Sequence, residues 1–168
     1  MSTGLVSYAL KFFADPDAVK REVVAPMLVW EKEEGLHGSE EAMTSLSASG
    51  APPPQHGEPL VLPLRKGVKQ SNAFGLGVTV GRTENNDIVL MDNSVSRFHG
   101  YFLQDQKSQQ WMLVDAESKN GTWVEGVKLS PNRPVPVPTR AKLRFGHVEV
   151  RYFTPDEFFA HLQQLQGG

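Results

Sequence analysis

Residues 142–153 read KLRFGHVEVRYF, and apolar and polar side chains alternate along them on both sides of one glycine. Leu143 and Phe145 share a face before Gly146, and Val148 and Val150 share a face after it. A period of two places one face of a strand on a core and the other in water, as in antiparallel sheets. The pattern therefore predicts two paired strands with a turn at Gly146.

Short apolar runs recur along the preceding sequence at intervals of roughly ten residues, separated by Gly, Asn, Asp and Pro, which is typical of a sandwich or barrel. The predicted strands are Leu60–Leu64, Gly77–Val80, Asp87–Leu90, Gly100–Leu103, Trp111–Asp115, Thr122–Val124, Lys142–Phe145 and Val148–Phe153. The expected fold class is all-β: an antiparallel β-sandwich with a short C-terminal helix and a partly disordered N-terminal leader.

Four segments are expected along the chain. They are an N-terminal segment (1–30), an acidic linker rich in Pro, Gly and Ser (31–59), the sandwich domain (60–153), and an amphipathic helix with a tail (154–168). In the first segment, Asp15 before Pro16 is a helix start that Pro26 should end. The sequence leaves open whether this segment is a short packing helix or a disordered arm.

The C-terminal segment begins with a helix signal. Thr154, Pro155 and Glu157 have the spacing of a capping box with proline at the first helical position. Apolar residues then recur at helical spacing, so we expect this helix to dock on the sandwich; they are Phe158, Leu162 and Leu165.

Composition excludes several classes of function. The 168 residues contain no cysteine, which excludes disulfides, thiolate metal sites and cysteine nucleophiles. No apolar run approaches the roughly 20 residues of a spanning helix, and the N-terminus lacks an export signal. We expect a cytoplasmic protein with no membrane contact, no metal and no cofactor.

Charge argues against nucleic acid as a partner, because the net charge is −2 and a basic face dominates such binding. Its distribution is uneven. Residues 1–59 carry nine acids and four bases, whereas residues 60–168 carry ten acids and thirteen bases. This asymmetry favours an anionic ligand for the second part of the chain.

Polar residues cluster just beyond or between the predicted strands, where loops on a β scaffold commonly build binding sites. The clusters are Gly81-Arg82, Asn86-Asp87, Ser94-Val95-Ser96-Arg97-Phe98-His99 and Asp115-Ala116-Glu117-Ser118-Lys119-Asn120-Gly121-Thr122. In this order and spacing, together with Phe145-Gly146, they resemble the signature of forkhead-associated (FHA) domains. The resemblance covers roughly residues 60–153, and it implies a β-sandwich that binds phosphothreonine peptides and catalyses nothing.

The resemblance assigns phosphopeptide-binding roles to six positions: Arg82, Ser96, Arg97, Ser118, Lys119 and Asn120. Arg82 is the main phosphate ligand, because a guanidinium offers a charged fork of donors. Ser96 supplies a hydroxyl to the phosphate and Arg97 adds charge. Asn120 grips the main chain of the peptide. Lys119 stands where relatives place a small polar residue, so its contact with phosphate is less defined.

Four further positions are expected to support the site: Gly81, His99, Gly121 and Thr122. The family's corresponding histidine is a scaffold residue whose ring holds the binding loops, and His99 has no second histidine at a metal-ligand spacing. Ser118 either contributes a hydroxyl to the ligand or shapes the turn, and the sequence leaves both open. Trp111 and Trp123 lie in alternating runs typical of core or cross-strand residues.

Parts of the sequence are also compatible with two other functions. Ser96, His99 and Asp115 contain the residue types of a hydrolase triad, but no nucleophile elbow accompanies them. An FHA fold that assembles proteins without phosphate is the stronger alternative, because fold does not fix function.

The expected function is that of a signalling adaptor, with a phosphothreonine-containing protein as partner and a Ser/Thr protein kinase upstream. A small chain with one such domain is more typical of bacteria than of eukaryotes. Thr44 follows Glu40-Glu41 in the leader, and its phosphorylation would allow the domain to bind its own N-terminal segment.

Overall fold

The computed structural model describes residues 3–31, 58–66 and 77–167, and in them two β-sheets pack face to face. The larger sheet has the order β1 (Thr3–Gly4), β3 (Leu60–Pro63), β2 (Met27–Trp30), β12 (Val148–Phe153), β11 (Lys142–Phe145), β8 (Thr122–Val124), β9 (Val127–Lys128). The smaller sheet has the order β10 (Val135–Pro136), β7 (Trp111–Asp115), β6 (Gly100–Gln104), β4 (Val78–Gly81), β5 (Ile88–Val89). The expected sandwich is confirmed.

The pairing is antiparallel throughout these sheets except between β4 and β5, which run parallel. The β11–β12 hairpin follows the alternation in the sequence. Leu143 pairs with Val150 and both are buried, whereas the neighbouring Lys142 and Arg151 are exposed. The inward residues of both sheets, such as Phe102 and Phe145, form one continuous core.

Strand β2 lies between β3 and β12 and was not among the predicted strands. Its four residues Met27–Trp30 are all buried. Leu28 and Trp30 face the sandwich core, whereas Met27 and Val29 face a second core beneath the helices. A strand buried on both faces shows no alternation. The sheet therefore includes part of segment 1–30, while the domain boundaries themselves remain a prediction.

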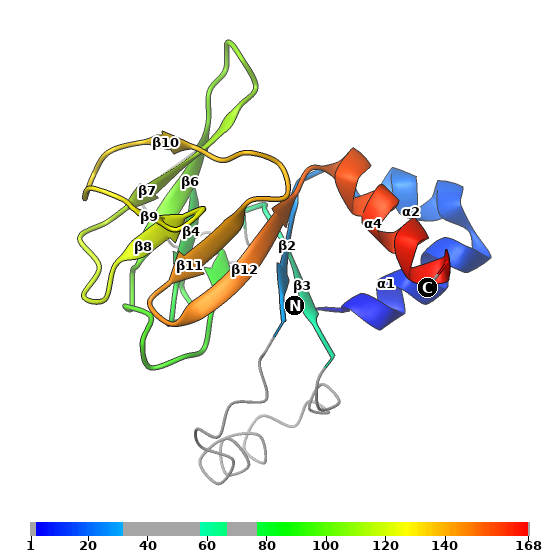
Figure 1. Ribbon diagram of the computed structural model, residues 1–168, viewed down its shortest axis with the longest axis horizontal. Helices are drawn as coiled ribbons and strands as arrows, with labels where there is room; N and C mark the ends of the chain where they lie inside the picture. The colour runs from blue at the N-terminus through cyan, green and yellow to red at the C-terminus, as the bar shows by residue number, and fades with distance from the viewer. Residues whose placement is uncertain (1–2, 32–57, 67–76, 168) are drawn as a thin grey trace, which may run out of the picture.

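Three helices cover the outer face of the larger sheet near β2 and β12: α1 (Leu5–Ala14), α2 (Pro16–Glu22) and α4 (Pro155–Gly167). Figure 1 shows them gathered beside β2, β3 and β12 and away from β8 and β9. Asp15 caps α2 by accepting from the Ala18 N–H at 3.2 Å. The N-terminal segment thus contains packed helices, and residues 32–57 of the expected linker lie outside the described residues.

Helix α4 begins with the expected cap, since the Thr154 hydroxyl accepts from the Glu157 N–H at 3.4 Å. Phe158 and Leu162 are fully buried and pack with α1, where the Phe158 and Tyr8 rings meet edge to face at 5.6 Å. Leu165 was expected to dock with them, but it is 43% exposed because α1 covers the other side of the helix.

Within the described residues, no helix is long and apolar enough to cross a membrane. The same part of the chain contains no group of three or more His, Cys, Asp or Glu side chains arranged to hold a metal ion.

Candidate functional site

Three loops meet at one end of the sandwich: residues 82–87 after β4, residues 90–99 after β5, and residues 116–121 after β7. Hydrogen bonds join them directly. The Arg82 N–H donates to the Ser96 carbonyl at 2.9 Å, and the Lys119 N–H donates to the Ser96 hydroxyl oxygen at 3.0 Å. The Asn120 amide nitrogen donates to the Ser94 carbonyl at 2.8 Å. The sequence clusters therefore converge on one surface.

Arg82 is held by its backbone and by one nitrogen of its guanidinium. Nε donates to the Val95 carbonyl at 3.1 Å. No ion pair or hydrogen bond links its two Nη atoms to any other described residue, and its side chain is half-buried. Gly81 allows this close packing, because a Cβ there would lie 2.1 Å from the Arg97 carbonyl oxygen. Arg82 thus presents two Nη groups in a fixed direction.

Ser96 lies between Arg82 and the third loop. Its hydroxyl oxygen accepts from the Lys119 N–H, so the hydroxyl proton is left to be donated elsewhere. Its backbone N–H donates to His99 Nδ1 at 3.0 Å. Ser96 can therefore donate to an anion that also contacts the Arg82 fork.

His99 is fully buried and links two of the loops. Nδ1 accepts from Ser96, so the ring proton is on Nε2, which donates to the Gly121 carbonyl at 2.9 Å. Burial lowers the pKa of His99, and the bond to Gly121 and the charge of Asp115 only partly offset this effect. The imidazole is thus neutral, and backbone groups occupy both of its nitrogens.

A buried carboxylate organises the third loop. Asp115 is 3% exposed and accepts hydrogen bonds from the Thr122 hydroxyl at 2.6 Å, the Ser118 N–H at 3.2 Å and the Ser118 hydroxyl. The Ser118 oxygen in turn accepts from the Gly121 N–H at 3.1 Å. Both functions of the Ser118 hydroxyl are therefore used within the turn, which favours the turn-shaping role over direct ligand contact.

These contacts are incompatible with a hydrolase triad. The Ser96 hydroxyl contacts Lys119 and not the His99 ring. The oxygens of Asp115 are taken up by Ser118 and Thr122, and His99 Nε2 faces Gly121. A triad requires the hydroxyl, imidazole and carboxylate to be bonded in series.

The remaining predicted ligands lie at the rim of the site. Arg97, Lys119 and Asn120 are exposed, and none of the ion pairs among the described residues includes Arg97 or Lys119. Asn120 uses its amide nitrogen on Ser94, so its side-chain oxygen is available to accept from a peptide N–H. Gly121 turns the chain with a φ of +94°. Arg82, Arg97 and Lys119 bring positive charge to these loops, which also carry the exposed Glu84 and Glu117.

Sequence analysis gave no role to Asn86, which ties the first loop to the second. Asn86 is 8% exposed, and its amide nitrogen donates to the Thr83 carbonyl at 2.9 Å and to the Arg97 carbonyl at 2.7 Å. The signal was a polar pair, Asn86-Asp87, directly before a buried strand.

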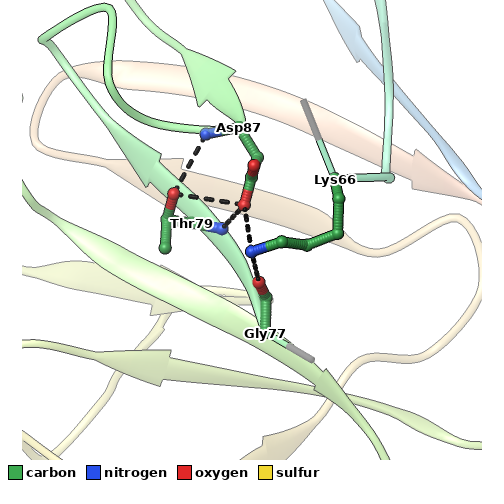
Figure 2. A network of polar contacts seen from close by, with 4 residues as sticks. All are labelled: Lys66, Gly77, Thr79 and Asp87. Carbon is green, nitrogen blue, oxygen red and sulfur yellow. Dashed lines mark hydrogen bonds and ion pairs between the residues drawn. The ribbon is translucent and has the colours of Figure 1, made fainter. Parts of the chain in front are cut away.

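Asp87, the last residue of the same loop, is held by a network of polar contacts, as Figure 2 shows. One carboxylate oxygen accepts from the Thr79 N–H at 2.9 Å and pairs with Lys66 Nζ at 3.0 Å. Lys66 also donates to the Gly77 carbonyl at 2.6 Å. This network anchors the start of β5 to β4 and to the residues after β3.

Comparison with known proteins identifies a matching family. Residues 78–146 match the sequence model of the FHA domain. The FHA domain-containing protein PS1 of Arabidopsis thaliana is 33% identical over 69 residues, which are 41% of this chain and 5% of that protein. The chain therefore spans a small fraction of this relative's length.

Similar solved structures are FHA domains. An engineered FHA domain with the Myc-pTBD peptide is 17% identical, with a TM-score of 0.51 over 83% of this chain and 98% of that one. An FHA domain studied for phosphothreonine-dependent interactions is 20% identical, with a TM-score of 0.48 over 77% and 97%. The FHA domain of a Chlamydia trachomatis protein is also 20% identical, with a TM-score of 0.47 over 77% and 97%. The engineered FHA domain, with a TM-score above 0.5 and 17% identity, shows that this chain has the same fold.

Proposed function

Because residues 78–146 are an FHA domain, we propose that this chain binds phosphothreonine-containing peptides through Arg82, Ser96 and Asn120. FHA domains are phosphopeptide-binding modules and not enzymes. The observation that carries the proposal is the fixed Arg82 fork, whose Nη groups have no partner among the described residues, next to a Ser96 hydroxyl that retains its proton.

The chemistry of the ligand matches these groups. A phosphothreonine carries a charge of about −1.5 to −2 and three strong acceptor oxygens. Arg82 supplies two parallel donors and Ser96 a third, while the exposed Arg97 and Lys119 add charge at the rim. The Asn120 oxygen accepts from the peptide main chain, which orients the peptide across the loops.

The proposal also covers the cellular role of the chain. We assign the chain the role of an adaptor in the cytoplasm, without catalytic activity, downstream of a Ser/Thr protein kinase. The three cations Arg82, Arg97 and Lys119, which form no ion pair within the described residues, support a phosphorylated partner.

The test is titration calorimetry with phosphothreonine peptides selected by the parent protein from an oriented library. Arg82→Ala removes charged hydrogen bonds of about 1.5–3 kcal/mol, so we expect the affinity to fall by about 10-fold to 150-fold. Arg21→Ala is the matched control, because Arg21 is exposed on α2, outside the three loops. Unchanged affinity of the Arg82 variant would refute the assignment.

The phosphate-independent alternative makes the opposite prediction. A protein that assembles partners on an FHA scaffold without phosphate binds the same peptide equally well with threonine or phosphothreonine. Measuring both forms against the parent protein separates the two functions.

Binding of phosphorylated Thr44 by the same chain's binding site is a further proposal. Thr44 lies outside the described residues, in the segment that joins β2 to β3, and the acidic sequence before it and the short chain between it and β3 support the proposal. A tether of this length gives an effective concentration of about millimolar order. Phosphorylation of Thr44 should shift the amide NMR signals of Arg82, Ser96 and Asn120 independently of concentration. Unchanged signals, or equal shifts in Arg82→Ala, would exclude self-capture.

A further inference from the structure

Arg144 in β11 is held in the same way as Arg82. Its Nε donates to the Gly146 carbonyl at 2.7 Å, and its guanidinium carbon lies 4.3 Å from the centre of the Trp123 ring. No ion pair within the described residues includes Arg144. Its side chain is thus fixed by one backbone contact and one aromatic face, and no hydrogen bond among the described residues uses its Nη groups.

A row of side chains continues across the outer face of the larger sheet. The strand register places Arg144 beside Trp123 and Trp123 beside Lys128. Lys128 Nζ lies 5.7 Å from the Trp123 ring. Glu149, the cross-strand neighbour of Arg144 on β12, is paired with Lys142 at 3.4 Å. We call Arg144, Trp123 and Lys128 the cationic ladder.

The cationic ladder borders the candidate site. A Cβ on Gly121 would lie 2.9 Å from both the Trp123 ring and the Lys128 side chain. The Gly146 N–H donates to the Gly121 carbonyl at 3.0 Å, and a Cβ on Gly146 would lie 2.3 Å from the Ser94 carbonyl oxygen. Ser94 is the residue that holds the Asn120 amide. The ladder therefore begins where the loop of Asn120 ends.

The helices leave this part of the sheet uncovered. They pack over β2, β3 and the end of β12, as Figure 1 shows, while β11, β8 and β9 continue towards the opposite edge of the sheet. Lys128 is exposed, and Trp123 and Arg144 are half-exposed. A cation stacked on an indole in this setting stabilises the sheet by only about 0.5–1 kcal/mol, so packing alone gives little reason for two cations on one ring.

We propose that the cationic ladder is a second binding position for the same phosphopeptide, which selects an aspartate or glutamate beside the phosphothreonine; this inference rests on the proposed function. The Arg144 fork binds the carboxylate, and Lys128 adds a second positive charge. The Trp123 ring provides an apolar surface for the methylene groups of the acidic side chain. The peptide reaches the ladder across Asn120, which holds its main chain.

The experiment compares two peptide libraries with degenerate flanks, one with a fixed phosphothreonine and one with a fixed threonine. Parent protein should retain the phosphorylated library and enrich Asp and Glu over Asn and Gln at one flanking position. Arg144→Gln should abolish that enrichment while still retaining the phosphorylated library. Matched peptides with Glu or Gln at that position should differ in affinity by about threefold to tenfold in the parent and not in the variant.

Two further variants complete the test. Lys128→Gln should reduce the enrichment. Because Lys128 is exposed, this variant should fold and can serve as the test if Arg144→Gln does not fold. Lys107→Gln, in the exposed turn between β6 and β7, should leave it unchanged. Enrichment that survives in both ladder variants, or no acidic preference in the parent, overturns the inference alone. Equal retention of the two libraries by the parent overturns the proposed function and the inference with it.

Discussion

Replacement of His99 by alanine separates a scaffold role from direct ligand contact, and its cost follows from the contacts of the ring. The half-buried Ser96 N–H loses its acceptor, which costs up to about 1–3 kcal/mol. The Gly121 carbonyl still accepts from the Gly146 N–H, so losing its bond to the imidazole costs less free energy. The missing ring leaves a cavity against Phe145, whose ring centre lies 5.6 Å away. We expect a total loss of about 2–4 kcal/mol.

Thermal unfolding followed by circular dichroism measures this loss. For a chain of this size it corresponds to a decrease in Tm of about 5–15 °C. His147→Ala is the matched control, because that histidine is exposed and only its backbone N–H bonds to Ser94. A His99 variant that melts like the parent but no longer binds phosphopeptide would show that the imidazole contacts the ligand, and the scaffold argument would be wrong.

The pH dependence gives a second readout of the same variant. Burial lowers the pKa of His99 in the folded protein, so the unfolded chain takes up a proton first as pH falls. The stability that this group contributes is present above its ordinary pKa of about 6.5 and is lost as pH falls through the lower folded pKa. The parent should therefore lose more stability between about pH 7.5 and pH 5.5 than His99→Ala. His161, whose pKa burial also lowers, contributes equally to both proteins.

Asp87→Ala should destabilise the protein by about 3–5 kcal/mol in urea unfolding, because it removes a carboxylate, only 1% exposed, that pairs with Lys66 and accepts from the Thr79 N–H. A loss below about 1 kcal/mol would mean that the network in Figure 2 contributes little. Burial raises the pKa of Tyr152 to about 12. The folded state therefore holds this proton more tightly than the unfolded chain, and the associated stability is full below about pH 10 and falls as pH rises towards 12. Tyr152→Phe should lose less stability than the parent between about pH 9 and pH 11, and equal losses would contradict the raised pKa.

The strands that could be predicted from the sequence are those with one face in solvent. The β11–β12 hairpin alternates strictly, because Lys142 and Glu149 face water while Leu143 and Val150 face the core. Strand β2 gives no such signal, since Met27–Trp30 are buried on both faces. Helix α1 was missed for a different reason: its N-cap is Gly4, which makes no side-chain cap, and its first turn carries no acidic residue, so the sequence gives no signal for its start.

The candidate site was predicted from the types of side chain in the loops and not from the geometry of the loops. Arg82, Ser96 and Asn120 stand out because their side chains suit an anionic peptide, and the structure brings them together at one end of the sandwich. The contacts of Asn86 and Asp115 could not be predicted, because they depend on how the loops fold back to bring the Arg97 carbonyl to Asn86 and the Thr122 hydroxyl to Asp115. The inward direction of the Ser118 hydroxyl, which bonds to Asp115, likewise depends on the conformation of its turn.

The scaffold contacts also determine how different substitutions should act on binding. Polar scaffold side chains, including His99 and Asn86, hold the loops through bonds to backbone atoms that exist without ligand. The ligand then has little ordering to impose, which favours affinity. Loss of a scaffold residue lowers the population of the competent loop arrangement, so it weakens every phosphopeptide by one common factor. Loss of Arg82 instead removes contacts to the phosphate itself, so it should also narrow the difference between phosphorylated and unphosphorylated peptide. The ratio of these two affinities therefore distinguishes a positioning residue from a phosphate ligand, even where both variants bind weakly.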